Sequence, residues 1–119
     1  MGSIMTIDFS NEKLERIAND ILLLDKLARK EKAHCTGNDI LETLNALVAA
    51  ENLFLVPQAP YHPHPLRGDR KGSFSVHIDK THRVIFRPNH KEGEVGYHIS
   101  NYKSITKITI EELCISYHN

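Results

Sequence analysis

The chain has 119 residues, which is enough for one domain with its own core and too short for two. Fifteen lysines and arginines balance fifteen aspartates and glutamates, so the chain as a whole gives no indication of a nucleic-acid partner. The absence of a membrane-spanning run, of a signal segment and of a Cys-x-x-Cys spacing for Cys35 and Cys114 predicts a cytoplasmic protein with reduced thiols and no membrane contact.

The first half of the chain predicts a helical hairpin. Ser10 can cap a first helix, in which apolar residues recur at helical spacing over residues 14–28. Gly37 interrupts this pattern, and a second apolar stripe covers residues 40–48. Stripes of this period usually face a core, so we interpret residues 1–56 as a scaffold.

The second half, residues 57–119, predicts a sheet. Four prolines between residues 56 and 65 favour an extended loop that delivers His64. Apolar and polar residues then alternate on both sides of a short turn, as in an antiparallel hairpin. The predicted strands cover residues 74–78, 83–87, 95–99 and 105–115. With the apolar side chains facing the helices, His77, Arg83 and Arg87 would share the opposite face of the sheet.

Charge is distributed unevenly between the two halves. Residues 1–56 contain six lysines and arginines against nine acidic residues, a net of −3, whereas residues 57–119 contain nine against six, a net of +3. Seven of the eight histidines also lie in the second half. A cationic surface of this kind attracts phosphate-bearing partners, although a merely solvated charged face would give the same composition.

The residue types in the second half fit cleavage of RNA without a metal. That reaction needs a base for the ribose 2′-hydroxyl, cations around the phosphate and an acid for the leaving 5′-oxygen. His64 and His118 are candidates for the acid and the base, and Tyr117 can position the base or the nucleotide. The candidate phosphate ligands are Arg67, Arg70, Lys71 and Arg83.

The remaining histidines have simpler interpretations. Isolated histidines are usually solvated polar residues, so we expect no direct role for His77 or His82. His62 and His64 together also suggest a zinc site. No cysteine cluster or helical histidine pair completes four ligands, so we assign no metal.

Taken together, these motifs carry a family resemblance. The segment His64-Pro-Leu-Arg-Gly-Asp-Arg-Lys-Gly, the Arg83-Val-Ile-Phe strand and the terminal Tyr117-His118 resemble the HigB branch of the RelE-like toxins, the ribosome-associated messenger-RNA interferases of bacterial toxin–antitoxin pairs. The resemblance implies a single α+β domain over residues 1–119, in which two N-terminal helices pack on a small twisted, mainly antiparallel sheet. It also implies that His64, Tyr117 and His118 are catalytic.

The resemblance further implies partners and products. The RNA would be messenger RNA in the ribosomal A site, cut by 2′-hydroxyl attack to leave a 2′,3′-cyclic phosphate and a 5′-hydroxyl, with no cofactor. The protein partner would be a small helix-turn-helix antitoxin, and operator DNA would be contacted only through that antitoxin.

One departure from the family pattern keeps a second hypothesis open. The family usually ends in Asp-Tyr-His, whereas this chain has Ser116 at the position of the aspartate. If imidazole orientation is lost with that carboxylate, the protein would be a catalytically weakened or inactive module that binds RNA or the ribosome. It would then act mainly as antitoxin partner and corepressor.

Overall fold

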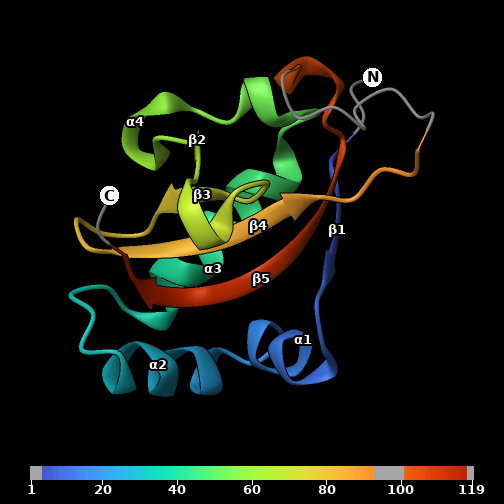
Figure 1. Ribbon diagram of the computed structural model, residues 1–119. Coiled ribbons are helices and arrows are strands. Elements are labelled where there is room, and N and C mark those ends of the chain that lie inside the picture. The colour runs from blue at the N-terminus through green and yellow to red at the C-terminus, as the bar shows by residue number, and fades with distance from the viewer. Residues whose placement is uncertain (1–3, 93–100, 118–119) are drawn as a thin grey trace.

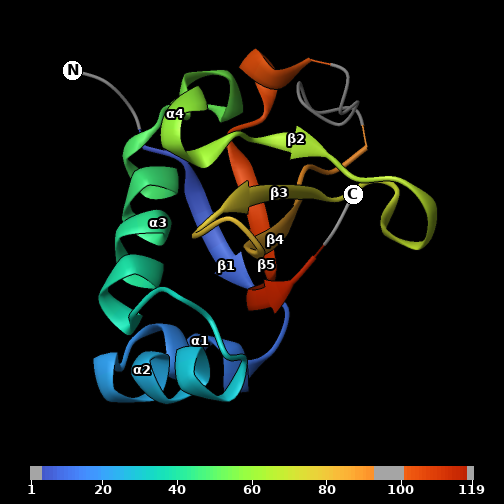
Figure 2. The ribbon, with the colours of Figure 1, turned by 90° about the vertical axis from the view of Figure 1, so that its left-hand side faces the viewer.

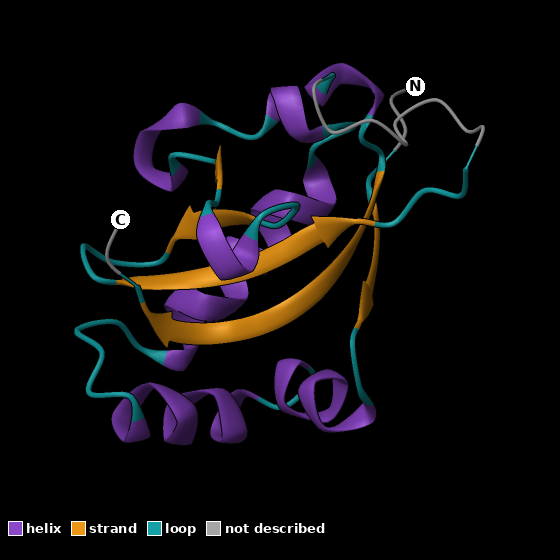
Figure 3. Ribbon diagram, in the orientation of Figure 1, coloured by secondary structure: helices purple, strands orange, loops and turns teal. Residues whose placement is uncertain are grey.

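A computed structural model describes residues 4–92 and 101–117, and a five-stranded sheet in the order β1-β5-β4-β3-β2 lies at its centre (Figure 1). The strands are β1 (Thr6–Phe9), β2 (His64–Pro65), β3 (Phe74–His77), β4 (His82–Pro88) and β5 (Lys107–Ser116). The helices are α1 (Glu12–Ala18), α2 (Ile21–Lys30), α3 (Gly37–Ala49) and α4 (Gln58–Tyr61), with 3₁₀ turns η1 (Leu53–Leu55), η2 (Gly68–Arg70) and η3 (Tyr102–Ser104). The predicted α+β class is confirmed, and Figure 3 shows how the helices surround the strands.

The sheet is mainly antiparallel, as predicted, but it contains one parallel pair. β2–β3, β3–β4 and β4–β5 pair antiparallel, whereas β1 runs parallel to β5 with Thr6 opposite Lys107. The sequence analysis missed β1, because four residues in which only alternate positions are partly buried give too short a pattern. The predicted strand over residues 95–99 lies outside the described residues.

The single first helix predicted from the sequence is wrong, because the chain forms two helices there. Asn11, not Ser10, caps α1, and its side chain accepts a hydrogen bond from the Leu14 N–H at 2.9 Å. α1 stops at Ala18, and Asp20 starts α2 by accepting the Leu22 N–H at 2.9 Å. The Asp20 carboxylate thus binds N–H groups at the start of α2, which favours ending α1 and changing the direction of the chain.

Helix α3 begins in close contact with α2. Thr36 and Asp39 form a reciprocal capping box at its start. The Gly37 N–H donates to the Asp25 carboxylate at 2.7 Å, and a Cβ at position 37 would lie 2.5 Å from the Asp25 backbone nitrogen. A glycine is therefore required where the two helices meet.

The core lies between α3 and one face of the sheet, as Figure 2 makes clear. Phe74, Val76, Val84 and Phe86 are fully buried there, so the predicted inward face of the hairpin is confirmed. Cys35 and Cys114 are buried free thiols in the same core. Among the described helices, none has the length and apolar character needed to cross a membrane.

Candidate functional site

The face of the sheet opposite α3 carries the candidate site. In Figure 2, α3 stands on one side of the sheet, whereas the loop that contains η2 extends on the other. Because side chains alternate along a strand, Ser75 and His77 of β3 lie on the face opposite the core residues Phe74 and Val76. This outer face is where His64 and the cationic loop meet the sheet.

His64 is placed by the short strand β2, which pairs it with Ser75. Its ring is partly buried, with Nδ1 2.9 Å from the His62 carbonyl oxygen and Nε2 3.4 Å from the Ser75 hydroxyl. A proton on Nδ1 would be donated to that carbonyl, which would leave Nε2 as an acceptor. The proline-rich loop thus delivers His64 to the sheet, as the sequence predicted.

His77 is the site residue that the sequence analysis missed. Its ring centroid lies 6.1 Å from that of His64 and 4.9 Å from that of His62. Burial, followed by the nearby cations of Arg83, His62 and His64, lowers the pKa of His77 from 6.5 to about 4. Two of these histidines precede β3 and one ends it, so only β2–β3 pairing brings the three rings together.

The cationic loop between β2 and β3 is shaped by two glycines in the left-handed region. Gly68, the first residue of η2, has φ of 65°, and Gly72, two residues after η2 ends, has φ of 97°. Arg67 and Lys71 are exposed on this loop, while Arg70 is partly buried. The loop therefore presents two exposed cations beside β3.

Two adjacent carboxylates of β5 reach the cations of this face. Glu112 lies 3.8 Å from Arg70, and Glu111 lies 3.3 Å from Arg87 and also accepts from the Ser73 hydroxyl. Between the Phe86–Ile110 and Ile85–Glu112 pairs, β5 contains one residue more than β4. This β-bulge explains why neighbouring carboxylates both reach the outer face.

Arg83 is placed differently from the prediction. It is buried, with 8% of its surface exposed, and its guanidinium donates to the carbonyls of Asp79 (2.8 Å), His82 (3.1 Å) and Lys80 (3.0 Å). These bonds close the β3–β4 turn and involve both terminal nitrogens of the guanidinium, while its buried Nε has no hydrogen-bond partner among the described residues. In this arrangement Arg83 supports the turn, and its role as a phosphate ligand stays a prediction.

The β3–β4 turn is itself fixed by Asp79. Burial raises the pKa of this carboxyl, but the N–H groups of Thr81, His82 and His34 outweigh burial and lower it from 3.8 to about 2. His82 is also buried, with Nε2 2.8 Å from the Glu31 carbonyl oxygen. The sequence predicted a solvated side chain at His82, whereas in the structure this side chain joins the turn to the end of α2.

Tyr117 lies at the same end of the sheet. Its backbone N–H donates to the Thr81 carbonyl at 3.0 Å, which brings the end of β5 to the β3–β4 turn. The predicted partner His118 lies outside the described residues. Over residues 4–92 and 101–117, no three His, Cys, Asp or Glu side chains are grouped as metal ligands.

The comparisons with known proteins give structural matches alone, since no family model and no curated protein matches the chain. YafQ from Escherichia coli BL21(DE3) superposes with a TM-score of 0.53 at 19% identity, covering 94% of this chain and 92% of YafQ. The chain therefore has the RelE-like toxin fold.

Two further solved structures are similar to this chain. A histidine-to-glutamine mutant of E. coli YafQ gives a TM-score of 0.50 at 19% identity, again over 94% of this chain and 92% of that one. A YoeB/ParE toxin from Agrobacterium tumefaciens gives a TM-score of 0.48 at 15% identity, over 96% of this chain and 100% of that one. None of these matches is a HigB protein, so the HigB branch stays a prediction within the RelE-like fold.

Proposed function

We propose that this RelE-like protein is the toxin of a toxin–antitoxin pair and cleaves messenger RNA on the ribosome without a metal. The observation that supports the proposal best is the juxtaposition of two imidazoles, His64 and His77, with ring centroids 6.1 Å apart beside the cationic loop. Paired imidazoles next to cations are suited to proton transfer at a phosphodiester.

In the proposed reaction, the RNA lies across the outer face of the sheet. Arg67, Arg70 and Lys71 bind phosphates, and their charge offsets the negative charge that develops on the non-bridging oxygens of the attacked phosphate. The ribose 2′-oxygen loses its proton to a base and bonds to phosphorus, and the bond to the 5′-oxygen breaks as an acid gives that oxygen a proton. The products are a 2′,3′-cyclic phosphate and a 5′-hydroxyl.

The low pKa of His77 suggests its part in this reaction. An imidazole with a pKa of about 4 is neutral near pH 7 and can therefore accept a proton. An RNA phosphate close by would raise this pKa toward the range that suits a general base. We assign His77 as a proton acceptor. His64, Tyr117 and His118 stay catalytic candidates, and the last two directly follow β5 in the sequence.

A second candidate function is supported by the ion pairs of the outer face. Arg70 and Arg87 each have a carboxylate partner on β5, and Ser116 replaces the aspartate of the family pattern. Both features favour a module that binds RNA or the ribosome weakly and no longer cleaves. Such a module would serve as antitoxin partner and corepressor, with operator DNA bound by a helix-turn-helix antitoxin.

The two functions differ in the ends they leave on RNA. Purified protein is added to ribosomes translating a defined message, and the message is mapped for cyclic-phosphate ends. We expect such ends with the natural chain and with His34→Ala, because the His34 side chain is exposed and the residue contacts the β3–β4 turn through its backbone N–H. The double variant His64→Ala/His77→Ala should lose at least about 100-fold in rate. Salt-sensitive binding without cleavage would favour the second function.

A further inference from the structure

His62 has an unusual backbone conformation just before β2. Its φ of 45° and ψ of 57° lie in the left-handed region, which residues other than glycine seldom adopt. Its N–H donates to the Gln58 carbonyl at 2.7 Å and so ends the short helix α4, and Pro63 then fixes its own φ. Figure 2 shows the chain passing from α4 into β2, which lies beside β3. The position of His62 at the edge of the site is therefore set by the backbone.

His62 contacts both imidazoles of the proposed site, and the three residues form a histidine cluster (His62, His64 and His77). The carbonyl oxygen of His62 lies 2.9 Å from Nδ1 of His64. The ring centroid of His62 lies 4.9 Å from that of His77, with an angle of 54° between the two ring planes. Because one contact is made by the backbone and the other by the side chain, substitutions can alter them separately.

The backbone contact determines which nitrogen of His64 carries the proton. A carbonyl oxygen can only accept a hydrogen bond, so a neutral His64 bonded to it has its proton on Nδ1 and uses Nε2 as an acceptor. Nε2 lies 3.4 Å from the hydroxyl of Ser75, which belongs to the outer face of the sheet. The backbone conformation of His62 therefore orients the acceptor nitrogen of His64 toward the face proposed to bind RNA.

The ring contact affects the protonation of His77. Burial lowers the pKa of His77 most, followed by the charges of Arg83, His62 and His64, while Asp79 in the β3–β4 turn acts in the opposite direction. Arg83 lies on β4, His64 on β2 and His62 at the end of α4, which are elements that pack against β3. The exposed ring of His62 thus adds both cover and positive charge beside His77, and both favour the neutral form that a proton acceptor requires.

From these contacts we propose that His62 is a positioning residue of the RNA-cleaving site, which holds His64 in one tautomer through its carbonyl and holds the ring of His77 through its imidazole. This role rests on the proposed function, since His62 acts through His64 and His77 and not by contact with the reacting atoms. The sequence suggested His62 only as a zinc ligand, because its contact with His77 depends on the pairing of β2 with β3.

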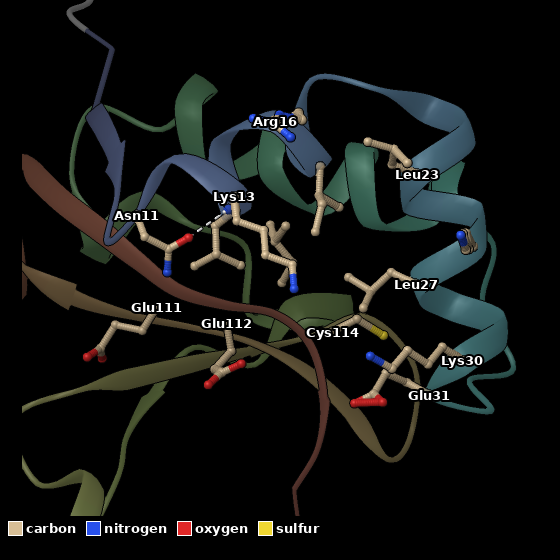
Figure 4. Close-up of a pocket in the computed structure, with 14 residues that line it drawn as sticks. Asn11, Lys13, Arg16, Leu23, Leu27, Lys30, Glu31, Glu111, Glu112 and Cys114 are labelled. Carbon is tan, nitrogen blue, oxygen red and sulfur yellow. Dashed lines mark hydrogen bonds between the residues drawn. The ribbon is translucent and has the colours of Figure 1, made fainter.

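Two variants separate the backbone contact from the ring contact. His62→Asn removes the ring and keeps a residue type that tolerates the left-handed conformation, so the carbonyl should stay in place. His62→Val removes the ring and also disfavours that conformation, because β-branched residues rarely adopt it. His34→Asn is the matched control, since it removes an exposed histidine from outside the cluster. The pocket between β5 and the helices α1 and α2 (Figure 4) has no histidine in its described lining, so these variants leave its lining residues unchanged.

NMR titration of the imidazole groups tests both contacts and needs no RNA. In the natural chain, the nitrogen chemical shifts should show neutral His64 with its proton on Nδ1. His62→Asn should keep this tautomer and raise the pKa of His77 by about 0.5 or more, because burial and positive charge beside the ring are both reduced. His62→Val should raise the pKa of His77 and also mix the tautomers of His64. Values in both variants that match the natural chain and His34→Asn would overturn the proposal.

The pH profile of RNA cleavage connects these contacts with the reaction. With His62→Asn, the acidic limb of the profile should move to higher pH by the same amount, and the rate at pH 7 should fall about threefold or more because His77 is held less firmly. His34→Asn should keep the natural profile. A rate that falls equally at every pH would indicate a merely structural role and contradict the proposal. If the natural chain leaves no cyclic-phosphate ends, the proposed function fails, and the NMR titration alone decides whether His62 positions the two imidazoles.

Discussion

The carboxylate of Glu112 on β5 lies 3.8 Å from the guanidinium of Arg70 in the cationic loop. Two segments more than forty residues apart are thereby joined across the outer face of the sheet. The pair is largely solvated, with 31% of the Arg70 side chain and 41% of the Glu112 side chain exposed, so it contributes little to stability. Its main consequence is electrostatic, because it neutralises a cation proposed to bind phosphate.

We predict that Glu112→Gln strengthens RNA binding. With its partner uncharged, Arg70 becomes free to neutralise one phosphate, so affinity for a short single-stranded RNA should rise a few-fold at low salt. The slope of log affinity against log salt concentration should steepen by up to about 0.7. Fluorescence anisotropy at several salt concentrations measures both quantities. Glu51→Gln removes an exposed carboxylate distant from the loop in sequence and serves as control; identical slopes for the two variants would refute the prediction.

We predict that Arg83→Lys destabilises the fold and leaves the salt dependence of RNA binding unchanged. A lysine cannot replace the planar fork that reaches three carbonyls of the β3–β4 turn. The free energy of unfolding should fall by about 2–4 kcal/mol, because one buried carbonyl and two partly buried ones lose a charged donor. Urea unfolding measures this change. A stable variant whose salt slope falls would instead make Arg83 a phosphate ligand.

The parts of the site that could be predicted from the sequence are those set by local pattern. Alternation over β3 and β4 identified the face of the hairpin that is buried, because the side-chain period of a strand is fixed by backbone geometry. The prolines and glycines around His64 and η2 likewise predicted a loop that carries cations. These signals lie within a few residues of the features that they specify.

The parts that could not be predicted depend on contacts between distant segments. His77 joins the site only because β2 pairs with β3, and Arg83 is buried only because the turn folds back over its side chain. The bulge that directs both Glu111 and Glu112 outward arises from a mismatch between β4 and β5, which neither strand shows alone. The charge counts from the sequence therefore predicted more unpaired cations on this face than the structure has, because Arg70 and Arg87 have carboxylate partners.

We predict that His77 makes stability depend on mildly acidic pH. Its pKa is about 4 in the folded chain, against 6.5 for an unperturbed histidine. Between these values the unfolded chain binds a proton that the folded chain does not, so stability due to this group is complete above about pH 6.5 and is lost as pH falls to about 4. Thermal unfolding across this range should show a flatter pH profile for His77→Gln than for His34→Gln. Parallel profiles would contradict the assigned pKa.

We predict that Asp79→Asn loosens the turn on which the proposed site depends. The carboxylate accepts N–H groups from His34, Thr81 and His82, and an amide has one acceptor oxygen instead of two. The free energy of unfolding should fall by about 1–3 kcal/mol, while Asp69→Asn in the exposed loop should leave it unchanged.

The effect of Asp79→Asn should also vary with pH in a defined direction. The folded pKa of Asp79 is about 2, against 3.8 for an ordinary aspartate, so its stabilising contribution is complete above about pH 3.8 and is lost as pH falls to about 2. The difference between natural chain and variant, measured by urea unfolding, should therefore shrink across this acidic range. A difference that stays constant would mean that the substitution destabilises the fold through packing and not through loss of the charge. The order of the turn would then have to come from other contacts.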